Sequence, residues 1–238
     1  MIRIRNLDFA YPDTRFRLRV KELDFAEAKR YCLRGPSGSG KTTLINIIAG
    51  ILKPTSGSVL VAGEEISRSR DALNRQFRLN KIGFIFQNFE LLDYLNVEQN
   101  ILLPFSIGWK MKVTPAVRER LDASLEQMGL SHKRRAHPRQ LSQGEKQRVA
   151  ICRAVVNEPE LIIADEPTAN LDEQNARRVI DLIAGLLEKK KTTFLMVTHD
   201  RSFDDFFDAI IEMDAIIEMD TIVAADSVTA AQGGGDDV

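Results

Sequence analysis

Hydrophobic and polar positions divide the chain into segments of two kinds. Near the N-terminus, apolar residues alternate with polar ones over residues 2–9 and 16–25, which predicts two half-exposed strands. Further along, apolar residues form short continuous runs instead. These runs predict five more strands, at residues 30–33, 58–61, 82–86, 161–164 and 193–198.

Helical patterns lie between the later strands. Residues 41–51 and 173–189 each predict a helix, and the segment from about 92 to 157 is mostly helical in pattern. Apolar strands that alternate with helices indicate a largely parallel sheet covered on both faces, whereas the alternating N-terminal strands indicate an attached antiparallel piece. We therefore expect one α/β domain over residues 1–225.

A hexapeptide is repeated near the C-terminus. Residues 209–214 read Ala-Ile-Ile-Glu-Met-Asp, and residues 215–220 repeat them. Because six is an even number, a strand would present the same residues on the same face in both copies, and we predict a peripheral hairpin. Residues 226–238 are polar and glycine-rich, so we expect a disordered tail.

Composition excludes several classes of protein. The 238 residues include 33 Lys and Arg against 34 Asp and Glu, and a net charge of −1 gives no general attraction to nucleic acid or anionic lipid. The two cysteines are too few for a disulfide framework or a four-cysteine metal site, and we predict buried thiols.

The longest uncharged apolar stretch, residues 44–52, is far shorter than the roughly 20 residues of a membrane-spanning helix. The first residues do not form a signal peptide, which predicts a cytoplasmic chain.

A glycine-rich segment follows the predicted strand at 30–33 and opens the predicted helix at 41–51. Its sequence over residues 35–42, Gly-Pro-Ser-Gly-Ser-Gly-Lys-Thr, has the spacing of a phosphate-binding loop. Glycines let backbone N–H groups surround phosphate oxygens, and the helix directs its positive end at the same anion. We expect Lys41 to reach the β- and γ-phosphates and the Thr42 hydroxyl to ligate Mg²⁺.

Two carboxylates follow another apolar run. Asp165 and Glu166 come directly after residues 161–164, so both are expected at the carboxyl edge of the sheet, where open α/β sheets bind ligands. Asp165 suits the Mg²⁺ shell, and Glu166 suits a general base that polarises the attacking water. Such a pair is common by itself, but together with the phosphate loop it is a strong signal.

A segment between these motifs resembles a family signature. Residues 141–148, Leu-Ser-Gln-Gly-Glu-Lys-Gln-Arg, resemble the signature motif of ATP-binding-cassette (ABC) ATPases, and residues 165–172 resemble the carboxylate motif and D-loop of that family. Three single residues also match the family, and all these elements follow one another along the chain as they do in the family. Tyr11 matches the aromatic residue that stacks on adenine, Gln87 the Q-loop glutamine and His199 the switch histidine.

This resemblance extends from about residue 2 to about residue 224. It implies the ABC ATPase fold, a P-loop NTPase core with a mostly parallel sheet, an antiparallel β subdomain and a helical signature subdomain inserted at about 88–157. It also implies ATP and Mg²⁺ as cofactors. The implied catalytic residues are Glu166, His199 and Gln87, and the implied Mg²⁺ ligands are Thr42, Gln87 and Asp165. The residues implied to hold ATP are Tyr11, Gly35, Pro36, Ser37, Gly38, Ser39, Gly40, Lys41, Thr42, Thr43, Ser142, Gly144 and Asp172.

The chain departs from the commonest signature, Leu-Ser-Gly-Gly-Gln, at two positions. Gln143 replaces the first glycine, and Glu145 replaces the final glutamine. Ser142 and Gly144, the groups expected nearest the γ-phosphate, are kept. We therefore expect each ATP to be enclosed between the phosphate loop of one copy and the signature of a second copy. The usual Asp-Gly turn after the last Met-containing strand is also absent.

The resemblance implies partners as well. It implies a head-to-tail dimer around two ATP molecules, in which Asp172 couples the two sites. It also implies a separate membrane permease, to which this chain attaches as a peripheral subunit on the cytoplasmic face of the inner membrane. No nucleic-acid partner is implied. We expect the permease to dock near Gln87–Leu95, on an apolar surface formed by Phe89, Leu91, Leu92, Tyr94 and Leu95.

Within the family, residues 87–92 and 166–172 most resemble bacterial ATPases that serve lipoprotein release, macrolide or peptide export, and cell-division permeases. Two alternatives remain open at this point. One is a soluble, non-transport ABC ATPase, although repair members carry a long coiled coil or zinc cysteines that this chain lacks. The other is a regulatory module that uses ATP only as a switch, against which the intact Glu166 and His199 count.

Overall fold

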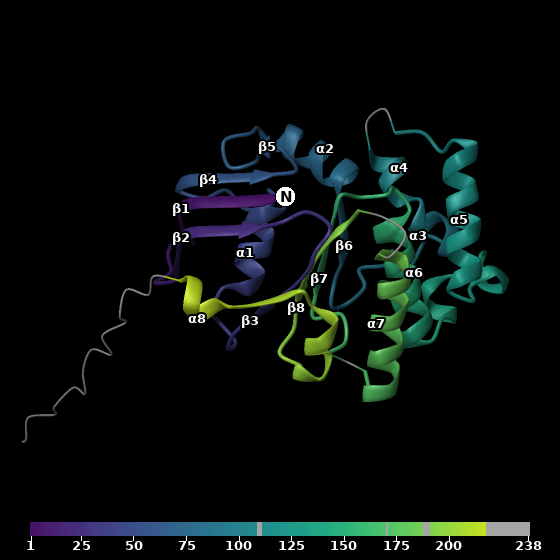
Figure 1. Cartoon of the computed structure of the whole chain (residues 1–238). Coiled ribbons are helices and arrows are strands. Elements are labelled where there is room, and N and C mark those ends of the chain that lie inside the picture. Colours follow the sequence, from purple (N-terminus) through teal and green to yellow (C-terminus); the bar gives the residue numbers. More distant parts are fainter. Residues whose placement is uncertain (109–110, 170, 188–190, 218–238) are drawn as a thin grey trace, which may run out of the picture.

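Two sheets of different kinds form the framework of the molecule (Figure 1). The computed structural model describes residues 1–108, 111–169, 171–187 and 191–217. In the core sheet all neighbouring strands run parallel, in the order β6-β7-β8-β3-β9. Its strands are β3 (Arg30–Arg34), β6 (Ile82–Ile85), β7 (Leu161–Asp165), β8 (Thr193–Val197) and β9 (Ala209–Glu212).

The second sheet is antiparallel, in the order β2-β1-β4-β5. Alternate side chains of β1, such as Ile2 and Ile4, are fully buried, as the alternating pattern predicts for a strand with one wet face. The strands of this sheet are β1 (Ile2–Ala10), β2 (Arg17–Phe25), β4 (Ser56–Val61) and β5 (Glu64–Glu65).

The two faces of the core sheet are covered by different layers. Leu161 and Ile163 of β7 pack with helix α1 and the antiparallel sheet in one apolar cluster. Ile162 and Ala164 point the other way and pack with helices that include α6 and α7 in a second cluster. This alternation explains why the core strands are apolar at every position. The helices are α1 (Lys41–Ile48), α2 (Asp71–Lys81), α3 (Val97–Ile101), α4 (Leu103–Ile107), α5 (Pro115–Gln127), α6 (Gln143–Val155), α7 (Glu173–Leu187) and α8 (Met213–Ile216), with 3₁₀ turns η1 (Ser131–Lys133), η2 (Pro138–Gln140) and η3 (Arg201–Phe206).

The structure confirms the α/β fold and the seven strands that the pattern predicts. It adds α2 and β5, which the pattern did not predict. Both cysteines are buried free thiols, as expected, and burial raises the pKa of Cys32 to about 11 and that of Cys152 to about 12. No helix within the described ranges has the length and apolar character that crossing a membrane requires.

The predicted hairpin at the repeated hexapeptide is wrong. The first copy forms β9, which pairs parallel to β3 at the edge of the core sheet. The second copy begins inside helix α8, and its last residues, together with the tail at 226–238, lie outside the described residues. Two contacts explain where β9 ends: Glu212 pairs with Arg34 at 3.7 Å, and Met213 is completely buried behind Gly35.

Candidate active site

The phosphate loop joins β3 to α1, as the sequence predicts. Gly38 and Gly40 have φ values of +82° and +92°, a left-handed conformation that favours glycine. Gly40 is the N-cap of α1, and neither a capping side chain nor an acidic residue occupies the first turn of this helix. The Lys41 ammonium folds back over the loop and donates to the carbonyl oxygens of Gly35 and Pro36, both at 2.8 Å. The free first-turn N–H groups and this ammonium together favour an anion.

A hydroxyl and a carboxylate meet beside this loop. The Thr42 hydroxyl donates to Asp165 Oδ2 at 3.3 Å, which joins the start of α1 to the end of β7. Burial raises the pKa of Asp165; the hydrogen bond from Thr42 opposes that rise, and the neighbouring Glu166 charge adds to it. Two oxygen donors at this distance are the kind of ligands that Mg²⁺ prefers.

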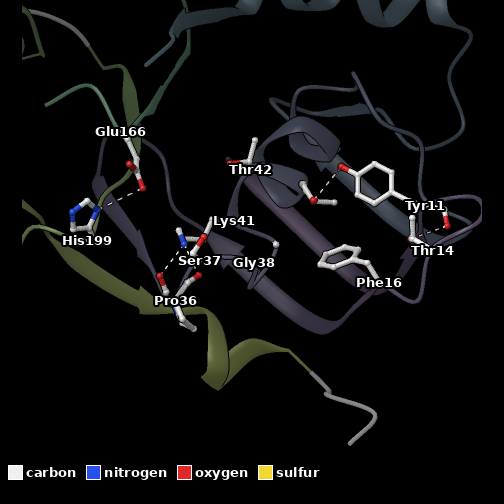
Figure 2. Close-up of a pocket in the computed structure, with 13 residues that line it drawn as sticks. Tyr11, Thr14, Phe16, Pro36, Ser37, Gly38, Lys41, Thr42, Glu166 and His199 are labelled. Atoms are coloured by element: carbon white, nitrogen blue, oxygen red, sulfur yellow. Dashed lines mark hydrogen bonds and ion pairs between the residues drawn. The ribbon is translucent and has the colours of Figure 1, made fainter. Parts of the chain in front are cut away.

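Glu166 has an unusual backbone. Its φ is +45°, which a non-glycine residue rarely adopts, and its N–H donates to the Val197 carbonyl at 2.9 Å. This bond to β8 places the Glu166 carboxylate opposite His199, and Nδ1 of His199 lies 3.6 Å from Oε1 of Glu166 (Figure 2). The histidine side chain is 71% exposed and the glutamate 26%, so both groups can reach a bound molecule.

These groups face one cavity of about 740 Å³. Figure 2 shows the phosphate loop between the Glu166–His199 pair on one side and the aromatic rings of Tyr11 and Phe16 on the other. The Tyr11 hydroxyl lies 3.2 Å from the Thr43 hydroxyl, and the Tyr11 ring meets the Phe9 ring edge to face at 4.8 Å. The lining residues are Tyr11, Thr14, Phe16, Gly35, Pro36, Ser37, Gly38, Gly40, Lys41, Thr42, Thr43, Glu166 and His199.

Two lining residues, Thr14 and Phe16, were missed by the sequence analysis. Phe16 counts there only as an apolar residue of a strand. In the structure its ring lies 5.7 Å from the Tyr11 ring, and its tip would come within 2.9 Å of a Cβ placed at Gly40. Only the spatial proximity of residue 16 to the loop makes it a site residue, and no sequence motif indicates that proximity.

Six predicted site residues do not line this cavity among the described residues: Ser39, Gln87, Ser142, Gly144, Asp165 and Asp172. Of these, Asp165 still contacts the lining residue Thr42. Gln87 is exposed and follows β6, whose neighbour β7 ends at Asp165. Asp172 caps α7, since its Oδ1 accepts from the Asn175 N–H at 2.9 Å. Ser142 and Gly144 lie at the start of α6. The signature is therefore not part of the cavity formed by its own chain.

Ser142 and Glu145 form a capping box at the start of α6. The Glu145 carboxylate accepts from the Ser142 N–H at 2.7 Å, and the Ser142 hydroxyl oxygen accepts from the Glu145 N–H at 3.2 Å. The bond from the Ser142 N–H is the largest cause that holds the pKa of Glu145 below its usual value. This gives Glu145 a structural role at the position where the commonest signature has glutamine.

Gln147 joins the signature helix to the carboxylate motif. It is completely buried, and its Nε2 donates to the carbonyl oxygen of Pro167.

The phosphate loop at residues 35–42 opens a helix beside a strand that ends in two carboxylates. This arrangement defines a P-loop NTPase, and the chain is a protein of that class.

Comparison with known proteins gives the family. The sequence matches the family described as ABC transporter over residues 18–169. The putative hemin import ATP-binding protein HrtA of Staphylococcus haemolyticus is 43% identical over 197 residues, which cover 82% of this chain and 87% of that protein. The lipoprotein-releasing system ATP-binding protein LolD of Pseudomonas syringae is 39% identical over 212 residues, which cover 88% and 92%.

Solved structures agree with this result. The dimeric, post-hydrolysis ATP-binding cassette MJ0796 bound to ADP and Pi matches with a TM-score of 0.80 and 33% identity, covering 92% of this chain and 97% of that one. The chain belongs to the ABC transporter family. It is an ATP-binding and ATP-hydrolysing cassette that works as a dimer and drives a separate membrane permease. These findings favour transport over the two alternatives that the sequence left open.

Proposed function

We propose that the cavity binds one MgATP and that Glu166 activates the water that attacks its γ-phosphate. The observation that carries this proposal is the Thr42–Asp165 contact of 3.3 Å beside the phosphate loop. Thr42 and Asp165, with Gln87 from the neighbouring strand end, would hold Mg²⁺, which would neutralise phosphate charge. The described residues contain no cluster of three His, Cys, Asp or Glu side chains that could hold a metal without the nucleotide's own oxygens.

Each group at the cavity then has a defined task. Lys41 exchanges its two carbonyl acceptors for phosphate oxygens, and the backbone N–H groups of residues 37–43 surround the remaining ones. Glu166 accepts a hydrogen bond from the attacking water and polarises it. His199 contacts the γ-phosphate and keeps the Glu166 carboxylate oriented. Tyr11 stacks on the adenine at the far side of the loop.

The signature completes the site of the partner copy. Ser142 and Gly144 lie outside the cavity of their own chain, so a two-fold partner must bring them to the phosphates. The capping box uses the Ser142 oxygen as an acceptor, and its O–H proton stays available for a γ-phosphate oxygen. ATP then joins the two copies, Asp172 lies between the two sites, and hydrolysis loosens the dimer.

The permease-docking surface differs in part from the prediction. Phe89 is buried and Leu91 packs against the helical core, whereas Tyr94 is 75% exposed, so the predicted residues form an exposed apolar surface only in part. A groove of about 320 Å³ lies beside them, and we call it the docking groove. Ile107 and Ile51 at this groove are 61% and 46% exposed, as a surface that receives an apolar helix face requires. The groove is lined by Ile51, Arg78, Leu79, Ile82, Gly83, Phe84, Phe86, Glu90, Leu103, Pro104, Ile107, Arg153, Ala154 and Asn157.

We place the cassette on the cytoplasmic face of the inner membrane, attached through this groove to a bacterial permease of the export or lipoprotein-release type. The relative named for lipoprotein release supports this assignment, and the relative named for hemin import shows that similar cassettes serve different cargo. Because the groove recognises the permease rather than its cargo, it does not specify what is transported.

Two measurements on the purified chain test the proposed function. ATP turnover is measured against protein concentration, and Glu166→Gln is run on size exclusion with MgATP. We expect turnover to rise faster than linearly with concentration and the variant to form a stable ATP-dependent dimer, because bound ATP persists when its hydrolysis stops. Glu145→Gln, which keeps the size of that side chain at the capping box, is the matched control and should hydrolyse ATP. A Glu166→Gln variant that stays monomeric and hydrolyses ATP would sink the assignment.

A further inference from the structure

Two consecutive residues between Gln87 and the docking groove hold an uncommon backbone conformation. Phe89 has a φ of +62° and Glu90 a φ of +47°. Neither is glycine, and such conformations persist only where surrounding contacts hold them. The turn also has its own hydrogen bonds, from the Phe89 N–H to the Phe86 carbonyl at 3.0 Å and from the Glu90 N–H to the Asn88 carbonyl at 2.7 Å.

Arg153 supplies the contacts from outside the turn. Its Nη1 donates to the carbonyl oxygen of Glu90 at 2.6 Å, and its Nη2 donates to the carbonyl oxygen of Phe89. A planar guanidinium can hold two neighbouring carbonyls in a fixed geometry, which a lysine ammonium cannot do. Burial lowers the pKa of Arg153, and the nearby Glu90 charge opposes that effect. The guanidinium is thus partly desolvated, and two of its nitrogens donate to backbone oxygens.

The position of Arg153 connects three parts of the cassette. It belongs to α6, the helix that begins at the signature residue Ser142. It lines the docking groove together with Glu90. The turn that it holds lies two residues after Gln87, the proposed Mg²⁺ ligand. A helix seated in the groove would therefore contact the arginine and one of the two residues that it holds.

We propose that Arg153 is a positioning residue: by holding the carbonyls of Phe89 and Glu90, it fixes the place of Gln87 and ties the wall of the docking groove to the signature helix. This inference rests on the proposed roles of Gln87 and of the groove. Without the arginine, Phe89 and Glu90 relax toward ordinary backbone angles, and Gln87 moves with them. ATP binding at the phosphate loop stays intact, because the hydrogen bonds of Arg153 go to Phe89 and Glu90 and not to that loop.

The test compares two variants with a matched control in the full chain. Arg153→Met removes both hydrogen bonds, and Arg153→Lys keeps the charge but not the double contact. The control is Arg120→Met, which removes another arginine-to-carbonyl bond to the same region, from Arg120 Nε to the Val156 oxygen at 3.0 Å, together with an ion pair to Glu158 at 3.1 Å. The kcat and KM for ATP are measured, together with hydrogen exchange of the amides of residues 88–92.

For Arg153→Met we expect a kcat about tenfold lower, a KM for ATP within twofold of wild type, and faster exchange at Phe89 and Glu90 with unchanged exchange in the phosphate loop. For Arg153→Lys, kcat and the exchange rates at Phe89 and Glu90 should lie between those of wild type and those of Arg153→Met. The lysine variant also keeps the test possible if Arg153→Met does not fold. Arg120→Met should lower Tm while kcat stays within twofold.

Two results would overturn this role. One is a kcat of Arg153→Met that matches the Arg120→Met control, and the other is unchanged exchange at residues 88–92. A wild-type chain that hydrolyses no ATP at any concentration is a separate failure, because it contradicts the proposed function itself and not the role of Arg153.

Discussion

The side chain of Asn100 holds the backbone of residues 92–96, and its substitution gives the sharpest test of that role. Its side chain is completely buried, and its Oδ1 accepts from the Leu92 N–H at 2.8 Å. Its Nδ2 donates to the carbonyl oxygens of Leu92, Leu95 and Asn96 at 3.1, 2.9 and 3.1 Å. Asn100→Ala leaves one backbone donor and three backbone acceptors without this partner.

The expected loss of stability follows from these contacts. The amide nitrogen has two N–H protons for its three acceptors, so with the Oδ1 bond the side chain makes about three full hydrogen bonds. At about 1 kcal/mol net for each, Asn100→Ala should lower the free energy of unfolding by about 3 kcal/mol. For a chain of this size that corresponds to a fall in Tm of about 6–12 °C. Asn100→Asp should be at least as unfavourable at pH 7, because its carboxylate faces three carbonyl oxygens. Asn88→Ala, at an exposed position nearby, should change little.

Urea unfolding followed by far-UV circular dichroism measures these differences, with thermal melts beside it. The m-value should stay constant, so that a change in midpoint reports a change in stability. The KM for ATP should also stay constant, since Asn100 lies outside the cavity. A loss below about 1 kcal/mol for Asn100→Ala would refute the reasoning, because water would then replace the amide at no cost.

Three further outcomes are expected. Tyr11→Ala should raise the KM for ATP about tenfold with little effect on kcat, since stacking on a base contributes about 1–3 kcal/mol; an unchanged KM would contradict the adenine site. Gly83→Ala should lower unfolding stability in urea by about 3 kcal/mol, because its Cβ would lie 2.2 Å from the Ala154 carbonyl oxygen; stability equal to wild type would be inconsistent with that contact. Asp165→Asn should raise Tm without nucleotide at pH 7 while turnover is lost. Burial and the Glu166 charge raise the pKa of Asp165, so its ionised form destabilises the fold above that pKa. The gain in Tm should therefore shrink as the pH falls toward about 4, and a gain independent of pH would argue against this cause.

Much of the core could be predicted from the sequence because its strands carry strong local signals. Strand β7 is apolar at four consecutive positions and ends in a carboxylate, so both its burial and its functional end follow from the pattern. Helix α2 escaped prediction for the opposite reason. Only Asn74 and Phe77 are buried in it and most of its other residues are polar, so the segment resembles an exposed connection more than a packed element.

The functional residues likewise divide into those that the sequence predicts and those that it does not. Lys41, Thr42, Asp165 and Glu166 come from contiguous motifs, and the structure places all four beside one cavity or in contact with it. The roles of Phe16, Asn100 and Arg153 depend on contacts between distant segments, which one sequence without an alignment does not reveal. The 209–220 repeat does not form the predicted hairpin, and alternation alone does not tell an edge strand of a parallel sheet from one arm of a hairpin.

The cavity takes residues from both sheets, and this affects how the cassette unfolds. Tyr11 and Phe16 flank the ends of β1 and β2 in the antiparallel sheet, whereas Lys41 and Glu166 follow strands of the parallel one. A nucleotide that contacts both groups binds only when the two sheets are docked. By mass action, ATP at a hundredfold excess over its dissociation constant adds about 2.7 kcal/mol to the folded state. In a cell, the ATP concentration thus helps to decide how long the two halves of the domain remain together, and with them the chain's resistance to proteolysis.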